Sequence, residues 1–239
     1  MEFKSFDRRA RRFLFLVLGL LFVWGLVAYV AMPDFWRTYY HRHPELDDLP
    51  DRTTAGDGVP GDPLNVALIG SEEDVGALLV AAKWRKADPL SLKSSLEIAE
   101  ASVFKRDYDA APVSSLYLFG RKEDLAYEQL VGGDPRHRHH VRFWKTDRLD
   151  GDGRPVWVGS AVYDEHVGLS RTTGQITHVT SPDVDKERDY LFQCCENSGR
   201  MIERYEIEHF HKVLAGKNGG GDPWRTDGAL YVGVSEAVR

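Results

Sequence analysis

"HHVRFWKT" (residues 139–146) and "PVWVGSAVYD" (residues 155–164) are the two segments that decide the fold. Both are rich in β-branched and aromatic residues, and "LDGDGR" (residues 149–154) between them supplies Asp and Gly, which tolerate positive φ. We therefore predict two strands joined by a turn. Because side chains alternate along a strand, the first segment should divide into two sets, one with His139, Val141 and Phe143 and the other with His140, Arg142 and Trp144.

The flanking segments add strand and helix signals. Residues 64–70 and 114–120 are short apolar runs that end at Gly, which is typical of strands. Ser71 and Asp74 form a capping box, which predicts a helix directly after the first of these runs. A second helix is expected at 90–105, where apolar residues share one stripe.

The C-terminal third gives a third helix and two closing strands. "SPD" (residues 181–183) offers Ser181 as an N-cap and a proline at the first helical position. "MIERYEI" and "GALYVGVS" have the composition of strands. Together the segments predict an α+β domain with a mixed, mostly antiparallel sheet and about three helices.

The charge and cysteine content exclude two classes of protein. The 239 residues carry a net charge of −6; residues 1–32 contribute +3, so the remainder is −9. An acidic body argues against nonspecific binding to nucleic acid, and we expect no nucleic-acid partner. The two cysteines, Cys194 and Cys195, are adjacent on the third predicted helix, so the chain is no disulfide scaffold, and packing on the core explains them better than reactivity.

The N-terminal region predicts a membrane anchor. The run from Phe13 to Met32 has 20 residues without a charge, enough for a transmembrane helix whose partner is the lipid bilayer. It is long for a cleaved signal peptide and lacks a good cleavage site. Five Lys and Arg precede it, which places residues 1–12 in the cytoplasm and the body outside. Residues 33–62, rich in Pro and Gly, are expected to be a linker, and residues 63–239 the folded domain.

Several polar residues are candidates for a functional site. His139 lies on the more apolar face of its strand, where it is either a core histidine or a ligand. A metal site requires three or four converging donors, and the candidates for zinc or another divalent metal are His139, His178 and Asp222. Such a site also forms if the sheet brings together His139 or His140, Asp164, His166 and His178. No local metal-ligand spacing is present, and no cofactor is predicted. For acid–base chemistry the candidates are His139, His178, Asp164 and Asp185.

An anion site is the other possibility. Arg188 shares a helix stripe with Val184 and Leu191, where it requires a buried carboxylate or a bound anion. The "GGG" run at 219–221 permits an anion nest, a cation site with the neighbouring aspartates, or a hairpin loop. The anion-binding candidates are Arg142, Arg171, Arg188, Gly220 and Gly221.

Six stretches resemble the LssY-like C-terminal domain family: "PLNVALIGSEEDVGALLVAAKW", "APVSSLYLFGRKEDLAYEQ", "RHRHHVRFWKT", "RPVWVGSAVYDEHVGLSRTTGQITH", "DVDKERDYL" and "NGGGDPWRTDG". They cover residues 63–234 approximately. The resemblance implies no established activity. Some relatives carry this domain after multi-span membrane regions, including lipid-phosphate phosphatase-like ones, and this chain has no such phosphatase segment. The family's polar motifs fall on His139, His140, Arg142, Asp164, Arg171, His178, Asp185, Arg188 and Asp222, but a second histidine frequent after His178 is Val179 here.

Two functions follow as hypotheses. The first is a membrane-anchored binding or accessory module of the cell envelope, favoured because no catalytic motif is recognised. The second is an envelope hydrolase that acts on a phosphorylated or lipid-linked substrate. In the hydrolase, His139 or His178 acts as acid or base, the arginines hold an anion, and Asp164 or Asp185 orients a histidine.

Overall fold

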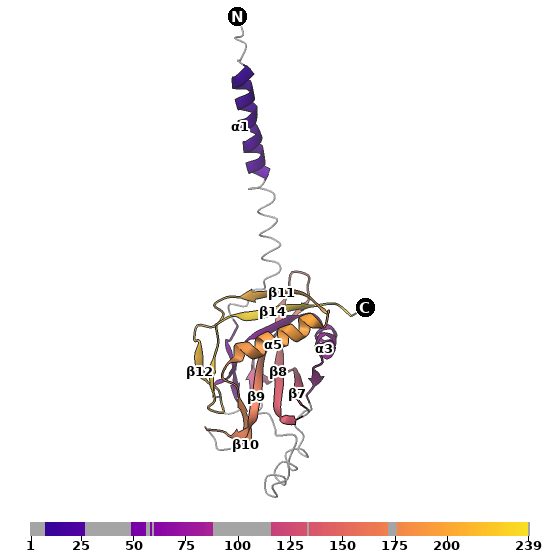
Figure 1. The fold of residues 1–239 in the computed structure, drawn as a ribbon, viewed down its shortest axis with the longest axis vertical. Coiled ribbons are helices and arrows are strands. Elements are labelled where there is room, and N and C mark those ends of the chain that lie inside the picture. Colours follow the sequence, from indigo (N-terminus) through magenta and orange to yellow (C-terminus); the bar gives the residue numbers. More distant parts are fainter. Residues whose placement is uncertain are drawn as a thin grey trace, which may run out of the picture. The chain divides into compact units, whose positions relative to one another are not determined.

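The fold of the chain is given by a computed structural model, which describes residues 8–26, 49–55, 58, 60–87, 116–132, 134–171 and 176–238. Within these residues the domain has three layers (Figure 1). Two helices, α3 (Glu72–Ala81) and α5 (Val184–Asn197), cover one face of an eight-stranded sheet, and a four-stranded sheet packs on the other face.

The large sheet is built around the predicted pair of strands. Its order is β11 (Met201–Ile207), β14 (Leu230–Ser235), β3 (Val66–Ile69), β9 (Pro155–Leu169), β8 (Asp134–Leu149), β7 (Leu125–Val131) and β4 (Arg85–Lys86), and β10 (Ile176–Thr180) also pairs with β9. Only β3 and β14 run parallel among the paired strands described. The mixed, mostly antiparallel sheet and the two strands joined by a turn are therefore confirmed, and both strands are longer than predicted.

The remaining strands form two small sheets. The four-stranded sheet has the order β2 (Pro60–Pro63), β1 (Arg52–Ala55), β5 (Leu116–Leu118) and β6 (Arg121–Lys122). A separate ribbon pairs β12 (Ala215–Lys217) with β13 (Pro223–Arg225). Strands β1 and β2 lie within the range 33–62 that was expected to be a linker, so sheet structure begins before residue 63.

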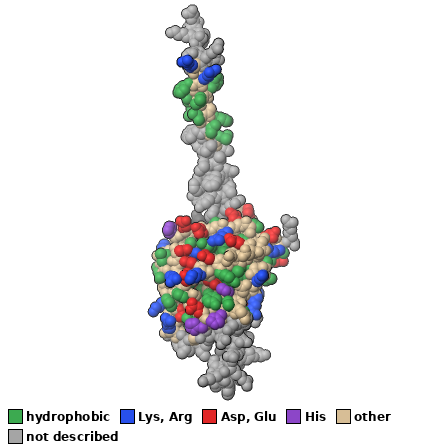
Figure 2. All heavy atoms as spheres, viewed as in Figure 1, with side chains coloured by type: hydrophobic (Ala, Val, Ile, Leu, Met, Phe, Trp, Pro, Cys, Tyr) green, Lys and Arg blue, Asp and Glu red, His purple; other side chains and the backbone are tan. Residues whose placement is uncertain are grey.

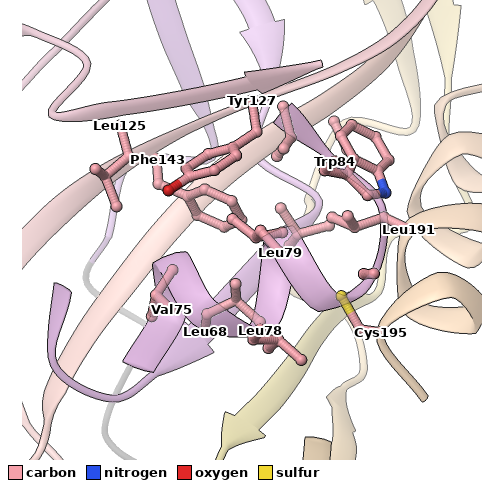
Figure 3. Packing of buried hydrophobic residues seen from close by; sticks show 14 of the residues in the cluster. Leu68, Val75, Leu78, Leu79, Trp84, Leu125, Tyr127, Phe143, Leu191 and Cys195 are labelled. Atoms are coloured by element: carbon pink, nitrogen blue, oxygen red, sulfur yellow. The ribbon is translucent and has the colours of Figure 1, made fainter. Parts of the chain in front are cut away.

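Two apolar cores, one on each face of the large sheet, hold the layers together. The helix-side core joins Leu78 and Leu79 of α3 and Leu191 of α5 to Phe143 of β8 (Figure 3). The opposite core contains Trp144, Val158 and Val232 from the large sheet and Leu116 and Leu118 from the small one. Each fully buried leucine contributes roughly 1.5–3 kcal/mol. The alternation predicted for β8 is confirmed, because Phe143 and Trp144 lie in different cores.

The helix ends agree with the sequence at α3 and differ at α5. Ser71 caps α3, and its capping box with Asp74 is formed. Helix α5 has Asp183 as its N-cap, without a side-chain cap hydrogen bond, so the prediction of Ser181 as N-cap is wrong. The helix expected at 90–105 lies outside the described residues.

Residues 1–45 contribute one described helix, α1 (Arg8–Leu26). The prediction of a transmembrane helix from Phe13 to Met32 is contradicted, because no helix in the described part of the chain is long and apolar enough to cross a membrane. Four arginines fall within the first five positions of α1, and its uncharged part, from Phe13 to Leu26, spans only about 21 Å against a hydrocarbon core of about 30 Å. The extracytoplasmic location stays a prediction.

Candidate functional site

Strand β8 divides the predicted polar residues between the two faces of the large sheet. His139 lies on the helix side, where its ring stacks on Tyr190 of α5. His140 and Arg142 lie on the opposite side, together with Arg138, which the alternation also places there. Two adjacent histidines therefore belong to different environments, and they are described in turn.

On the side away from the helices, Asp164 of β9 is the centre of a buried polar cluster. Its Oδ2 accepts a hydrogen bond from Arg138 Nε at 2.8 Å and lies 3.1 Å from His140 Nδ1. Arg138 also donates from Nη1 to Glu128 Oε2 at 3.0 Å and from Nη2 to His178 Nδ1 at 3.4 Å. Antiparallel pairing of β7, β8 and β9 brings these groups together, since Arg138 faces Asp164 and His140 faces Glu128.

Arg142 extends the cluster toward the small sheet. Its Nη1 lies 3.0 Å from His140 Nε2 and 3.9 Å from Asp62 Oδ2 of β2. An arginine has only donors, so His140 Nε2 accepts this bond and His140 is the neutral tautomer with its proton on Nδ1. Both ring nitrogens of His140 are thereby occupied. Burial lowers the pKa of Arg142, and the carboxylates of Glu123, Asp62 and Asp164 offset part of that effect.

The cluster is balanced in charge and closed to solvent. Burial alone would raise the pKa of Asp164, but its contacts with His140, His178 and Arg138 outweigh burial, and the pKa lies well below the ordinary carboxyl value. Asp164 is therefore an anion at neutral pH, held between donors. Arg138, His140, Arg142 and His178 are all buried. These side-chain contacts link the strands of the sheet, and Asp164 and His140 are hydrogen-bonded to each other.

On the helix side, His139 makes a different pair. Its Nδ1 lies 2.8 Å from Oε2 of Glu187, a residue of α5 that is only 4% exposed, whereas the His139 side chain is 17% exposed. Among the described residues, none makes a hydrogen bond to His139 Nε2. Burial raises the pKa of Glu187, and the hydrogen bond and charge of His139 offset part of the rise. A buried carboxylate thus orients a histidine whose Nε2 has no hydrogen-bond partner among the described residues.

Half-buried polar and aromatic side chains surround this pair. Gln129, His139 and Tyr163 are neighbours across β7, β8 and β9. The His139 ring lies 4.0 Å from that of Tyr190 and 4.9 Å from that of Tyr163, centroid to centroid. The Tyr190 hydroxyl donates to Gln129 Oε1 at 2.6 Å, and burial raises the pKa of Tyr190 to about 12, so it remains a donor. Together they form the helix-side site, defined as Gln129, His139, Tyr163, Tyr190 and Glu187.

Arg188, a predicted anion holder, is engaged in a structural network on α5. Its guanidinium donates to Asp227 at 2.8 and 3.0 Å and to Asp185 at 3.2 Å, and it lies 3.8 Å from the ring centroid of Tyr231. Asp185 in turn accepts from the Thr226 hydroxyl at 2.7 Å. On the face that carries α5, acidic and basic side chains lie intermingled (Figure 2). The buried Arg188 guanidinium is paired with carboxylates, but Asp185 is half-buried and Asp227 is exposed, so the predicted buried carboxylate is not found; neither Arg188 nor Asp185 joins the Asp164 cluster.

The glycine run forms a tight turn between β12 and β13. The Gly221 amide donates to Asn218 O at 2.9 Å, and Gly220 O accepts from the Arg171 amide at 2.8 Å. Asp222 Oδ2 accepts from the Thr180 amide at 3.2 Å, and burial raises the pKa of Asp222. Of the two glycines predicted to form an anion nest, Gly221 therefore uses its amide in a hydrogen bond within the turn. The Arg171 side chain is exposed beside this turn.

The metal candidates are not brought together. His139 lies on the helix side, and His178 lies with Arg138 and Asp164 on the other side. In the part of the chain that the structure describes, no three His, Cys, Asp or Glu side chains are arranged to hold a metal ion.

The sequence predicted several of the site residues but not the residues that form hydrogen bonds and ion pairs with them. Glu187 was not among the predicted site residues, although its spacing from Val184 and Leu191 places it near the buried stripe of α5. Arg138 was overlooked because β8 begins earlier than expected, at Asp134. Glu128 and Asp62 lie on strands that the sequence did not reveal. Of these residues, only Arg138 could have been found from the sequence, by extending the strand alternation back from residue 139 to residue 138.

A comparison with protein families gives one match. The family described as LssY C-terminus matches residues 46–230, which include β1 to β13 and both domain helices. The chain belongs to the LssY C-terminus family. Neither a curated protein nor a solved structure matches the chain. The match to the LssY C-terminus family begins before β1, in agreement with a domain that includes both strands of the supposed linker.

Proposed function

We propose that this LssY C-terminus domain is a binding module and that it contacts its ligand at the helix-side site. One observation carries the proposal. Of the candidate histidines, His139 combines partial exposure with an Nε2 that no described residue engages, and buried Glu187 fixes the orientation of its ring. His140, in contrast, has both nitrogens occupied inside the Asp164 cluster.

The chemistry of the site favours an uncharged ligand rich in hydroxyl groups, such as a sugar. Half-buried tyrosine and histidine rings offer flat apolar faces with polar edges, which suit a ring that is apolar on its faces and polar at its rim. Tyr163 and Tyr190 supply hydroxyls, and the Gln129 amide lies beside them. The arginines predicted to hold an anion lie elsewhere: Arg142 on the other face of the sheet, and Arg188 among its own carboxylates.

Saturation-transfer NMR on the full chain tests this proposal, with glucose, N-acetylglucosamine and maltose as probes. We expect transfer to at least one sugar, and its loss in His139→Asn and Tyr163→Ala. The first variant keeps a donor near the Nδ1 position for Glu187 while it removes Nε2. Tyr117→Ala, on the small sheet, is the matched control and should bind as the wild type does. Absence of transfer to all three sugars contradicts the sugar proposal.

A hydrolase is the second candidate, and the His139–Glu187 pair is what favours it. A carboxylate that orients a histidine is the arrangement of a general base. The substrate expected from the sequence is phosphorylated or lipid-linked. Turnover of p-nitrophenyl phosphate that survives Tyr117→Ala and disappears in His139→Asn is the result that supports a hydrolase over a binding module.

A further inference from the structure

Strand β11 is the outer edge of the large sheet among the described strands (Figure 1). Its inner side pairs with β14, where Tyr205 faces Val232, and no described strand pairs with its outer side. A free strand edge presents amide and carbonyl groups that can bind another strand. Proline, which prevents such pairing, is absent from β11.

The register of the sheet determines which residues of β11 present these groups outward. The Tyr231 amide of β14 donates toward β3, at 3.2 Å. Successive residues of a strand point their amides to opposite sides, so Val232 points toward β11, and Tyr205, which faces it, points back toward β14. The residues on either side of Tyr205, Arg204 and Glu206, therefore point their backbone amides and carbonyls away from the sheet.

The side chains at these two outward positions have opposite charges. Glu206 is exposed, and no described residue makes a hydrogen bond or an ion pair with its carboxylate. The Arg204 side chain is 37% exposed and donates from Nη1 to Glu196 at 3.1 Å. A guanidinium has five donors, so Arg204 can hold a second carboxylate at the same time. The free edge of β11 thus presents a cation and an anion two residues apart.

A second copy of β11, antiparallel about a two-fold axis, complements this pattern when the axis passes through Tyr205. Arg204 then faces the partner's Glu206, and Glu206 faces the partner's Arg204. Because these residues point outward on both copies, each pair combines backbone hydrogen bonds with an ion pair. An axis at Glu203, Arg204 or Glu206 instead places two like charges directly opposite each other, which is destabilising.

We propose that β11 pairs with β11 of a second copy of this chain in the register centred on Tyr205, which joins the two large sheets into one. A two-fold contact uses the same surface on both copies, and the charge pattern of this edge is complementary to itself. An unrelated peptide strand is less favoured, because it would have to supply the same alternation of charge. The inference concerns a different element from the helix-side site and does not depend on it.

Sedimentation equilibrium and amide hydrogen exchange of the full chain test the proposal together. The measured mass should rise with concentration toward twice the 27.1 kDa of one chain. The amides of Arg204 and Glu206 should exchange at least tenfold more slowly at high than at low concentration, while the Tyr205 amide, which faces β14, should change less. Exchange at these amides locates the contact even if another segment of the chain also associates.

Charge variants test the register. Glu206→Arg places arginines opposite each other, so the protection of the Arg204 amide should be lost, whereas Glu206→Arg combined with Arg204→Glu should restore protection at position 204. Glu208→Arg, an equal change of charge beyond the end of β11, is the matched control and should dimerise as the wild type does. Because the Glu206 side chain is exposed, Glu206→Arg should keep the wild-type melting temperature. The proposal is overturned if the Arg204 and Glu206 amides exchange equally fast at all concentrations, or if Glu206→Arg retains the protection.

Discussion

The adjacent histidines His139 and His140 lie on opposite faces of β8 and differ in their hydrogen bonds. On one side His140 lies between Asp164 and Arg142, with no nitrogen left for a ligand. On the other side the Nδ1 of His139 is hydrogen-bonded to Glu187, and no described residue makes a hydrogen bond to its Nε2. Both histidines contact a buried carboxylate, so the difference lies at the second nitrogen: Arg142 donates to it in His140, and no described residue makes a hydrogen bond to it in His139.

This difference separates a structural role from a binding role. Asp164 bridges Arg138 and His140, so removal of its charge leaves buried donors without their acceptor. Among the described residues, the Glu187 side chain makes a hydrogen bond only with His139. The Asp164 cluster should therefore control the stability of the domain, and the helix-side site should control its interactions.

The largest effect is expected from Asp164→Asn. Loss of the charge leaves the buried Arg138 without its closest anion, and we expect the free energy of unfolding to fall by about 3–5 kcal/mol. Urea unfolding followed by circular dichroism measures it. Glu165→Gln is the control, because its side chain is half-buried and makes no hydrogen bond among the described residues; its effect should stay within about 0.5 kcal/mol. A loss below 1 kcal/mol for Asp164→Asn contradicts a central role.

A smaller effect, with a distinctive pH dependence, is expected from Glu187→Gln. Burial raises the pKa of Glu187 in the folded state above its ordinary value of 4.5, so the folded state binds more protons than the unfolded state above that pH. Wild-type stability relative to the variant should therefore fall as pH rises from about 4.5 through the folded pKa, and then level off. Urea unfolding at a series of pH values measures the difference in the free energy of unfolding between the wild type and the variant. A wild-type advantage that grows with pH contradicts a raised pKa for Glu187.

Much of the fold followed from local patterns. The alternation in residues 139–146, the capping box at Ser71 and the apolar spacing of α5 were all sufficient, because each is set by neighbours along the chain. Strands such as β1, β2 and β13 escaped prediction because they are three to four residues long and rich in polar residues or proline. Strand β1 also pairs with a strand distant in sequence, with Tyr117 opposite Thr54, whereas β2 and β13 pair with near neighbours along the chain.

The site was predictable only in part. The separation of His139 from His140 followed from strand geometry alone. Which carboxylate meets each histidine did not, because Glu187 and Asp164 reach β8 through helix packing and strand register rather than through spacing along the chain. For the same reason the sequence left a carboxylate or an anion as the partner of Arg188, which is paired with Asp185 and Asp227 in the structure.

Chemical modification of the full chain at neutral pH tests the central claim most directly. Diethyl pyrocarbonate acylates accessible neutral imidazole nitrogens, and tandem mass spectrometry resolves His139 from His140 within one peptide. His139 should be acylated at least tenfold faster, because its side chain is 17% exposed and no described residue makes a hydrogen bond to its Nε2, while both nitrogens of His140 are hydrogen-bonded inside the sheet. Equal rates, or faster modification of His140, contradict the assignment of one open and one closed side to β8.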